Sequence, residues 1–170
     1  MTKVLLVGMM GAGKTTVGRL VADRLGCPYA DSDAEVEAAT GRTVPEIFAE
    51  QGEAAFRAAE AEVLAKAVAG DGAVVVSVAG GAVLDPANRA LIRRSGTVVW
   101  LRANPVTLAG RVGDGAGRPL LSERPGEELA RLEVVRRPYY AEVADAAVDV
   151  DGSTPEAVAE AVLAVLAVLG

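Results

Sequence analysis

A glycine-rich segment near the amino terminus has the residue types and spacing of a phosphate-binding loop. Residues 8–15 read Gly-Met-Met-Gly-Ala-Gly-Lys-Thr and follow the apolar run at residues 3–7. Glycines let backbone N–H groups close around phosphate oxygens, and the helix expected to start here directs its positive end at the same anion. The residues predicted to contact the phosphates are Gly11, Ala12, Gly13, Lys14, Thr15 and Thr16.

The residues of this loop predict a nucleoside triphosphate, and not a dinucleotide, as the ligand. Lys14 can reach the β- and γ-phosphates as a point charge, and the Thr15 hydroxyl can hold Mg²⁺. The glycines read G-x-x-G-x-G, so the dinucleotide pattern G-x-G-x-x-G cannot be laid over them.

Two aspartates stand at the end of the next expected strand. Ligands of parallel α/β sheets bind outside the carboxyl ends of the strands, which gives these positions functional weight. Asp31 and Asp33 alternate along an extended segment, so one can approach Mg²⁺ through water while the other meets a second substrate. The alternative is that Asp33 caps the following helix and Asp31 is solvated.

The composition excludes several kinds of site. The 170 residues contain no histidine, which removes histidine bases, Ser-His-Asp triads and histidine metal ligands, and Cys27 alone can form no disulfide within the chain. A net charge of −6 argues against nucleic acid or an anionic membrane as the main partner. The apolar run at residues 158–169 is too short to span a membrane. A reducing cytoplasm is the expected location.

The elements that must position these residues alternate between strand and helix, which predicts an α/β fold with a parallel sheet covered on both faces. Strands are expected at residues 3–7, 27–30, 73–78, 97–101 and 146–150. Helices are expected at about 14–25, 34–39, 45–51, 53–69, 86–95, 105–111 and 126–143, and from 155 onward. Gly52 should break the long central helix, and Thr43 should begin a capping box.

Six motifs in this order make the chain resemble the shikimate kinases, small P-loop kinases of the nucleoside monophosphate kinase class. They are residues 8–16, 31–33, 52–60, 77–81, 118–121 and 136–140. The resemblance implies transfer of the γ-phosphoryl group of ATP to the 3-hydroxyl of shikimate, a step of aromatic amino acid biosynthesis. It also implies a three-layer P-loop kinase fold with a five-stranded parallel sheet.

The same resemblance implies how the chain is organised. Residues 1–170 would form a single kinase domain that acts as a monomer. Residues 33–60 would form a shikimate-binding helical region, and residues 113–125 would form a mobile lid.

On the acceptor side, the resemblance assigns roles to residues at matching positions. Asp33 would act as a base or orient the acceptor hydroxyl, and Arg57 and Arg136 would clamp the shikimate carboxylate. Gly80 and Gly81 would bring backbone N–H groups up to the substrate. Forked guanidinium donors match a planar carboxylate, which agrees with arginines in these roles.

On the nucleotide side, the resemblance places Arg118 in the lid, where it would close over the phosphates. Arg111 would lie against the nucleotide, and the loop that ends at Pro155 would border adenine. Thr15 would ligate Mg²⁺ directly, and Asp31 would reach it through water.

Two positions need comment against the family pattern. Ala79 stands where the family usually has the first of three glycines, and its methyl group is harmless only if its φ is negative. Arg136 and Arg137 are adjacent, and the R-x-P-x-Y frame selects Arg136 as the clamp. Arg57 has a structural alternative as well, because it could form a surface ion pair with Glu53 or Glu60.

Two other functions remain open from the sequence. One is a kinase for another small polyol acid such as gluconate, or for a nucleotide. The other is a nucleotide-binding regulatory module in which the acceptor pocket has lost its reaction.

Overall fold

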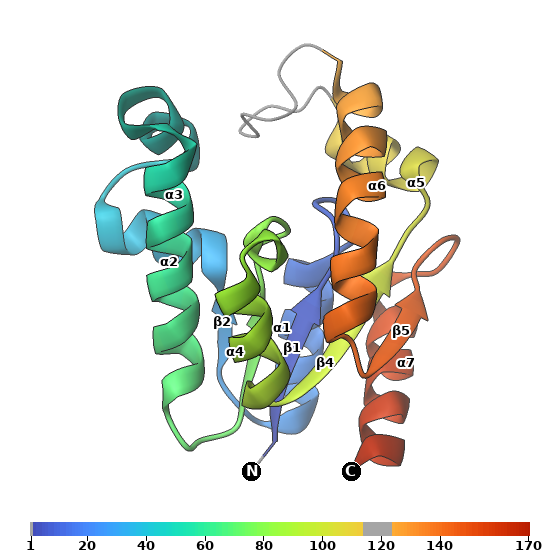
Figure 1. The fold of residues 1–170 in the computed structure, drawn as a ribbon. Helices are drawn as coiled ribbons and strands as arrows, with labels where there is room; N and C mark the ends of the chain where they lie inside the picture. Colours follow the sequence, from blue (N-terminus) through green and yellow to red (C-terminus); the bar gives the residue numbers. More distant parts are fainter. Residues whose placement is uncertain (1, 114–123) are drawn as a thin grey trace.

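The computed structural model describes residues 2–113 and 124–170 (Figure 1). Within these residues, five parallel strands form one sheet in the order β2-β3-β1-β4-β5. The strands are β1 (Lys3–Val7), β2 (Tyr29–Asp31), β3 (Val74–Ser77), β4 (Thr97–Arg102) and β5 (Ala146–Asp149). The predicted α/β class and the five-stranded parallel sheet are confirmed.

The helices of the described residues follow the predicted alternation with the strands. They are α1 (Lys14–Leu25), α2 (Ser32–Thr40), α3 (Val44–Ala69), α4 (Pro86–Ser95), α5 (Pro105–Val112), α6 (Pro125–Val143) and α7 (Pro155–Leu169), with a 3₁₀ turn η1 (Ala82–Leu84). None of these helices is both long and apolar enough to cross a membrane.

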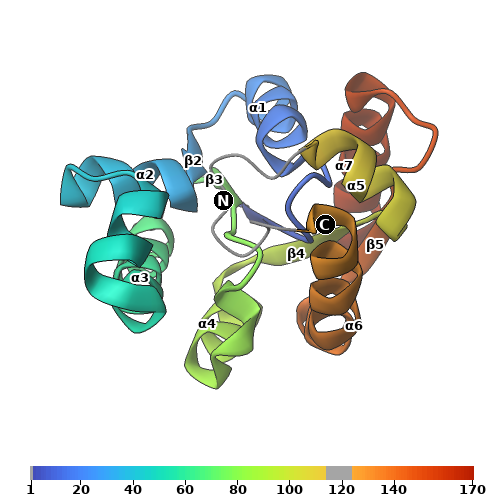
Figure 2. The same cartoon turned by 90° about the horizontal axis from the view of Figure 1, so that it is seen from above.

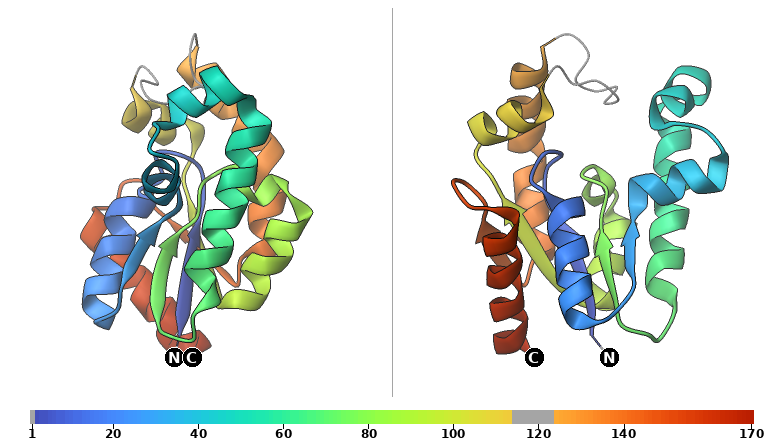
Figure 3. Two further views of the ribbon diagram at one scale, coloured as in Figure 1. Left: turned by 90° about the vertical axis from the view of Figure 1, so that its left-hand side faces the viewer. Right: turned by 180° about the vertical axis from the view of Figure 1, so that it is seen from behind.

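The sheet is the middle of three layers. Helices α1 and α7 cover one face, and α4 and α6 cover the other, with the carboxyl-terminal turns of α3 beside α4 (Figures 2 and 3). The strand residues Val4, Leu5, Leu6 and Val7 are buried, as expected for an apolar strand covered on both faces. Because β1 lies between β3 and β4, the loop that follows it emerges in the middle of the carboxyl edge, where ligands of such sheets bind.

The helical region formed by α2 and the start of α3 has a small core of its own. Val36, Ile47, Phe56 and Val63 form a buried cluster that is separate from the main core around the strands of the sheet. The predicted capping box is confirmed: the Thr43 hydroxyl accepts a hydrogen bond from the Glu46 N–H, and the Glu46 carboxylate accepts one from the Thr43 N–H.

One kink divides α3 where a break was predicted. Gly52 has φ 85° and ψ 171°, which is not helical, and it separates the first two turns from the longer second part. The kink turns the amino-terminal part of α3 over the end of α2, which brings this region above the sheet (Figure 3).

The second strand and the helix after it differ from the predicted boundaries. The Cys27 N–H donates to the Ala22 carbonyl and completes the end of α1, so β2 begins only at Tyr29. The helix α2 begins at Ser32, because the Asp31 side chain accepts hydrogen bonds from the first N–H groups of the helix. Asp31 is therefore the cap, and the predicted alternation of two aspartates along an extended segment is wrong.

Candidate active site

The loop between β1 and α1 has a backbone conformation that favours glycine. Gly8, Gly11 and Gly13 have φ of 147°, 84° and 96°, in the left-handed region that side chains disfavour. A Cβ on Gly8 would also lie 2.6 Å from the Leu101 carbonyl oxygen. The loop can therefore present its N–H groups, together with the amino end of α1, to an anion.

Two cations border this loop. Lys14 donates through Nζ to the carbonyl oxygens of Gly8 at 2.7 Å and Met9 at 3.0 Å. Arg111, from α5, donates through Nη1 to the carbonyl oxygens of Gly11 and Ala12, both at 3.3 Å. Positive charge thus lies on both sides of the predicted phosphate site.

The last residue of β2 faces the first turn of α1. The Thr15 hydroxyl donates to Asp31 Oδ2 at 2.8 Å, while Oδ1 accepts the N–H groups of Asp33 and Ala34. Hydroxyl and carboxylate oxygens suit Mg²⁺, which proteins commonly bind through one or two such groups together with substrate phosphates. The described residues contain no larger cluster of metal-ligating side chains. The Thr15–Asp31 pair therefore fits the predicted magnesium site.

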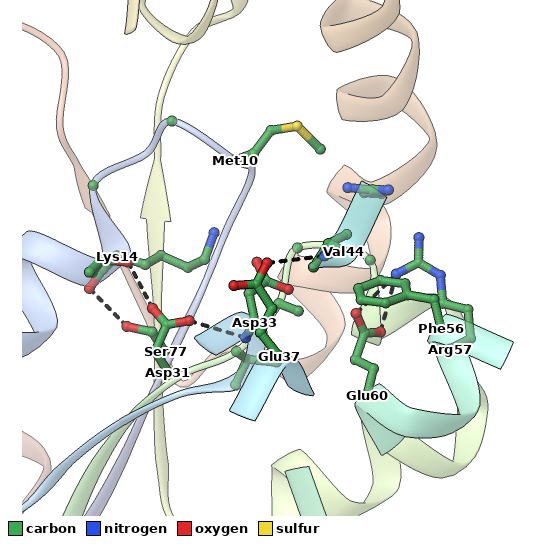
Figure 4. A pocket seen from close by; sticks show the side chains of 18 of the residues that line it. Met10, Lys14, Asp31, Asp33, Glu37, Val44, Phe56, Arg57, Glu60 and Ser77 are labelled. Carbon is green, nitrogen blue, oxygen red and sulfur yellow. Dashed lines mark hydrogen bonds and ion pairs between the residues drawn. The ribbon is translucent and has the colours of Figure 1, made fainter. Parts of the chain in front are cut away.

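These residues line a pocket of about 510 Å³ at the carboxyl edge of the sheet (Figure 4). In that view Asp33, in the first turn of α2, lies between Lys14 and the pair formed by Arg57 and Glu60. The predicted site residues that line the pocket are Gly11, Gly13, Lys14, Thr15, Thr16, Asp31, Asp33, Arg57, Gly80, Gly81, Arg111 and Arg136.

Three other predicted site residues are not part of this lining. Ala12 is a buried residue of the phosphate loop. Pro155 is exposed at the first position of α7. Arg118, with most of the predicted lid at 113–125, lies outside the described residues.

Arg136 is 1% exposed and is one of the largest fully buried side chains among the described residues. Its Nε and Nη1 atoms have no hydrogen-bond partner among the described residues. Buried charge without a partner is costly, so an anion that enters the pocket would gain strongly from meeting this guanidinium. Arg137, by contrast, points away and pairs with Glu133 through two contacts of 2.6 Å.

A buried tyrosine, Tyr140, contacts the loop that lies next to Arg136. Tyr140 donates its hydroxyl to the Gly80 carbonyl oxygen at 2.7 Å, and Arg136 Nη1 lies 3.3 Å from the place of a Cβ on Gly80. Burial raises the pKa of Tyr140 to about 12, so the hydroxyl keeps its proton at neutral pH. Tyr140 thus connects the loop at residues 79–81 to α6, the helix that also carries Arg136. The sequence analysis missed this contact.

Arg57 is held by a buried carboxylate. Its Nη1 atom donates to both oxygens of Glu60 at 3.1 Å, and its Nη2 atom contacts Glu53 at 3.4 Å. The ion pairs considered as an alternative role for Arg57 are therefore present, and they occur within the pocket lining. Glu60 is 1% exposed and was missed as a site residue, although its spacing of three residues from Arg57 marked it as a possible partner.

Replacing Glu60 by glutamine should remove a pH-dependent loss of stability. Burial raises the pKa of Glu60 from 4.5 to about 7, although Arg57 opposes the shift. As the pH rises, Glu60 loses its carboxyl proton near pH 4.5 in the unfolded chain but only near pH 7 in the folded protein. The protonated Glu60 therefore contributes fully to the free energy of unfolding below pH 4.5, and this contribution is lost as the pH rises through about 7.

Urea unfolding at several pH values tests this expectation. From pH 4.5 to about pH 8, the free energy of unfolding of Glu60→Gln should rise relative to wild type by about 3 kcal/mol. Parallel pH profiles of the two proteins would contradict a raised pKa of Glu60.

Ala79 fits the loop at residues 79–81, which follows β3, without backbone strain. No non-glycine residue in the described part of the chain has a positive φ, so the condition under which its methyl group is harmless is met. Gly81 is different, since a Cβ there would lie 2.3 Å from Arg57 Nη1. Of the two positions, only Gly81 lacks room for a Cβ, because the Arg57 guanidinium would have to shift.

The phosphate loop, Arg57 and Arg136 line one pocket, so a nucleotide and a small anionic acceptor would meet there. This arrangement, on a three-layer parallel sheet, defines a P-loop kinase for a small molecule.

Comparison with known proteins gives the family. The model of the family described as "Shikimate kinase" matches residues 10–167. A shikimate kinase of Symbiobacterium thermophilum is 54% identical over 144 residues, which cover 83% of this chain and 82% of that protein. The structure of a shikimate kinase from Acinetobacter baumannii in complex with shikimate matches with a TM-score of 0.95 and 36% identity, over 99% of this chain and 94% of that one. The chain belongs to the shikimate kinase family, and the predicted kinase fold and enzyme class are confirmed.

A more distant structural match bears on the alternatives. A gluconokinase from Sinorhizobium meliloti matches with a TM-score of 0.62 and 21% identity, over 99% of this chain and 93% of that one. Likeness at that identity concerns the fold alone. Neither the gluconate kinase nor the regulatory module is favoured over the shikimate kinase assignment.

Proposed function

We propose that this chain transfers the γ-phosphoryl group of ATP to the 3-hydroxyl of shikimate, giving shikimate 3-phosphate and ADP. The observation that carries the proposal is the buried Arg136, whose unpaired guanidinium donors line the same pocket as the phosphate loop. Membership in the shikimate kinase family supports both substrates.

On the acceptor side, Arg57 and Arg136 hold the shikimate carboxylate. Each guanidinium offers parallel N–H donors that match the two carboxylate oxygens. Gly80 and Gly81 carry no side chain, so their backbone can approach the ring. Asp33 accepts a hydrogen bond from the 3-hydroxyl, which orients the oxygen for attack and provides a base for its proton.

On the nucleotide side, Lys14 and the loop N–H groups hold the β- and γ-phosphates. The Thr15 hydroxyl holds Mg²⁺ directly and Asp31 holds it through water; when bound, the ion neutralises charge on the phosphate oxygens. Arg111 lies against the nucleotide, and the loop that ends at Pro155 borders the adenine ring. Arg118 closes over the phosphates from a lid at residues 113–125.

The setting of the enzyme follows the same proposal. Residues 1–170 form one kinase domain, in which residues 33–60 provide the helical wall of the acceptor pocket. The protein acts as a cytoplasmic monomer in aromatic amino acid biosynthesis. Its net charge of −6 supports small anions held by local arginines, and not nucleic acid, as its ligands.

ADP release from MgATP, measured with a panel of acceptors, tests the function. The panel contains shikimate, quinate, gluconate, AMP and CMP, with EDTA as the metal-free control. Turnover should occur with shikimate, should require the metal and should be absent with the other acceptors. Turnover with another acceptor alone would reject the acceptor assignment, and nucleotide binding without any turnover would reject the kinase.

Replacing Gly81 by alanine should weaken shikimate binding. The added Cβ would lie 2.3 Å from Arg57 Nη1 and 2.5 Å from Nη2, so the guanidinium must leave its position over the pocket. Loss of one hydrogen bond to a charged group corresponds to a rise in the KM for shikimate of about tenfold.

Ala79→Gly is the matched control for Gly81→Ala. It changes the same loop by one methyl group at a position that is free of strain. Its KM for shikimate should stay within about twofold of wild type. Equal effects of the two substitutions would contradict the specific contact between Gly81 and Arg57.

A further inference from the structure

A chain of hydroxyl groups lies beside the Thr15–Asp31 pair and has no part in the mechanism above. The Tyr29 hydroxyl lies 3.0 Å from Asp31 Oδ2 and 2.9 Å from Ser77 Oγ. Ser77 in turn donates to the Lys14 carbonyl oxygen at 2.8 Å. The chain of contacts connects β2, β3 and the first turn of α1.

The strength of the available acceptors decides which hydrogen bonds the Tyr29 and Ser77 hydroxyl groups donate. Tyr29 and Ser77 have two hydroxyl protons between them for three contacts. The Asp31 carboxylate is the only charged acceptor of the three, and charge-assisted hydrogen bonds are the stronger ones. A tyrosine hydroxyl has an ordinary pKa of about 10 and therefore carries its proton at neutral pH. Tyr29 therefore donates to Asp31.

The ring of Tyr29 packs directly against α1, the helix that follows the phosphate loop. A Cβ on Gly18 of α1 would lie 2.6 Å from Tyr29 Cε2 and 2.9 Å from Ser77 Oγ. Glycine is a poor helix former, and at this buried position its missing side chain makes room for the tyrosine ring. The ring, and with it the direction of the hydroxyl, is set by this packing.

We propose that Tyr29 is a positioning residue that orients the Asp31 carboxylate toward Mg²⁺. Asp31 Oδ1 is tied to the amino end of α2 by two N–H groups, and Oδ2 accepts from Thr15 and Tyr29. When the Thr15 oxygen ligates the metal, the Tyr29 donor still holds Oδ2 against rotation. This role rests on the proposed function, in which Thr15 and Asp31 hold the ion.

The test is a Tyr29→Phe variant, which keeps the ring and its packing and removes only the hydroxyl. Binding of Mn²⁺, a paramagnetic substitute for Mg²⁺, is measured by electron paramagnetic resonance in the presence of ADP. The Kd of Mn²⁺ should rise about three- to tenfold, the range of one ordinary net hydrogen bond, because the lost contact acts on the ion only through the carboxylate. The Kd of ADP in EDTA should stay within about twofold of wild type, because Tyr29 acts on the metal ligand.

Tyr139→Phe is the matched control. Tyr139 lies on α6 with its ring 4.4 Å from the Arg89 guanidinium, and its hydroxyl makes no hydrogen bond within the described residues. This variant should leave the Kd of Mn²⁺ unchanged. In an Asp31→Asn background, Tyr29→Phe should change the Kd of Mn²⁺ by less than about twofold, because its effect passes through the carboxylate.

Three outcomes would overturn the proposal. An unchanged Kd of Mn²⁺ in Tyr29→Phe would show that the hydroxyl does not position the metal ligand. An equal loss of ADP affinity in EDTA would show a general disturbance of the phosphate loop. Absence of Mn²⁺ binding to wild type with ADP would reject the proposed metal site itself, and the role of Tyr29 with it, independently of any variant.

Discussion

Replacing Asp33 by asparagine should lower kcat for shikimate phosphorylation by about 10²–10⁴-fold, the range expected for loss of a positioned general base. Asparagine has nearly the shape of aspartate, but it is neutral and cannot take the proton of the 3-hydroxyl. Asp33 lines the pocket from the first turn of α2, whereas the nucleotide contacts come from α1 and the loop before it. The Kd of ATP should therefore stay within about twofold of wild type.

The control for Asp33→Asn is Glu35→Gln, a neutralised carboxylate in the same helical turn. Glu35 is exposed and is not part of the pocket lining. Its kcat should match that of wild type within about twofold. Steady-state kinetics with both substrates varied, together with ATP binding by calorimetry, separates the two effects. An Asp33→Asn enzyme with wild-type kcat would reject the role of Asp33 in the reaction.

Replacing Arg136 by lysine should raise the KM for shikimate by about 100-fold, equivalent to about 3 kcal/mol of lost binding. Lysine keeps the charge but loses the planar fork that meets two carboxylate oxygens. Arg136 is 1% exposed and its Nε and Nη1 atoms have no partner among the described residues, so no protein group replaces the lost contact.

The adjacent residue provides the control for Arg136→Lys. Arg137 undergoes the same change of side chain, but its side chain is 58% exposed and pairs with Glu133. The KM for shikimate of Arg137→Lys should stay within about twofold of wild type. Initial rates at saturating MgATP compare the two variants. A similar KM for both would contradict the assignment of Arg136, and not Arg137, as the carboxylate clamp.

The predictions from sequence were most complete where a feature depends on residues that are close together in the sequence. The phosphate loop needs its glycines, Lys14 and Thr15 within one short segment between a strand and a helix, so spacing alone identified it. The capping box at Thr43 and the break at Gly52 are likewise local features, and both are confirmed. The family resemblance added the acceptor residues, which no single local pattern would have identified.

The errors concern a helix cap and a buried carboxylate. Asp31 and Asp33 were predicted to alternate along a strand, but the Asp31 carboxylate caps α2 and the helix therefore begins one residue earlier than Asp33. Glu60 was visible only as an ion-pair partner, because its burial depends on how α3 packs over the pocket.

The sequence by itself determined the class of chemistry, the alternation of strands and helices, and the residues able to bind phosphate. These follow from residue types at short spacings, which govern local backbone conformation and charge. The tertiary structure alone decided that Arg136 is buried with two guanidinium nitrogens that have no partner among the described residues, and that Tyr140 holds Gly80. It also decided that Tyr29 reaches Asp31 beside Ser77. Such contacts join residues far apart in the chain, and burial and partner choice there depend on how whole elements pack against one another.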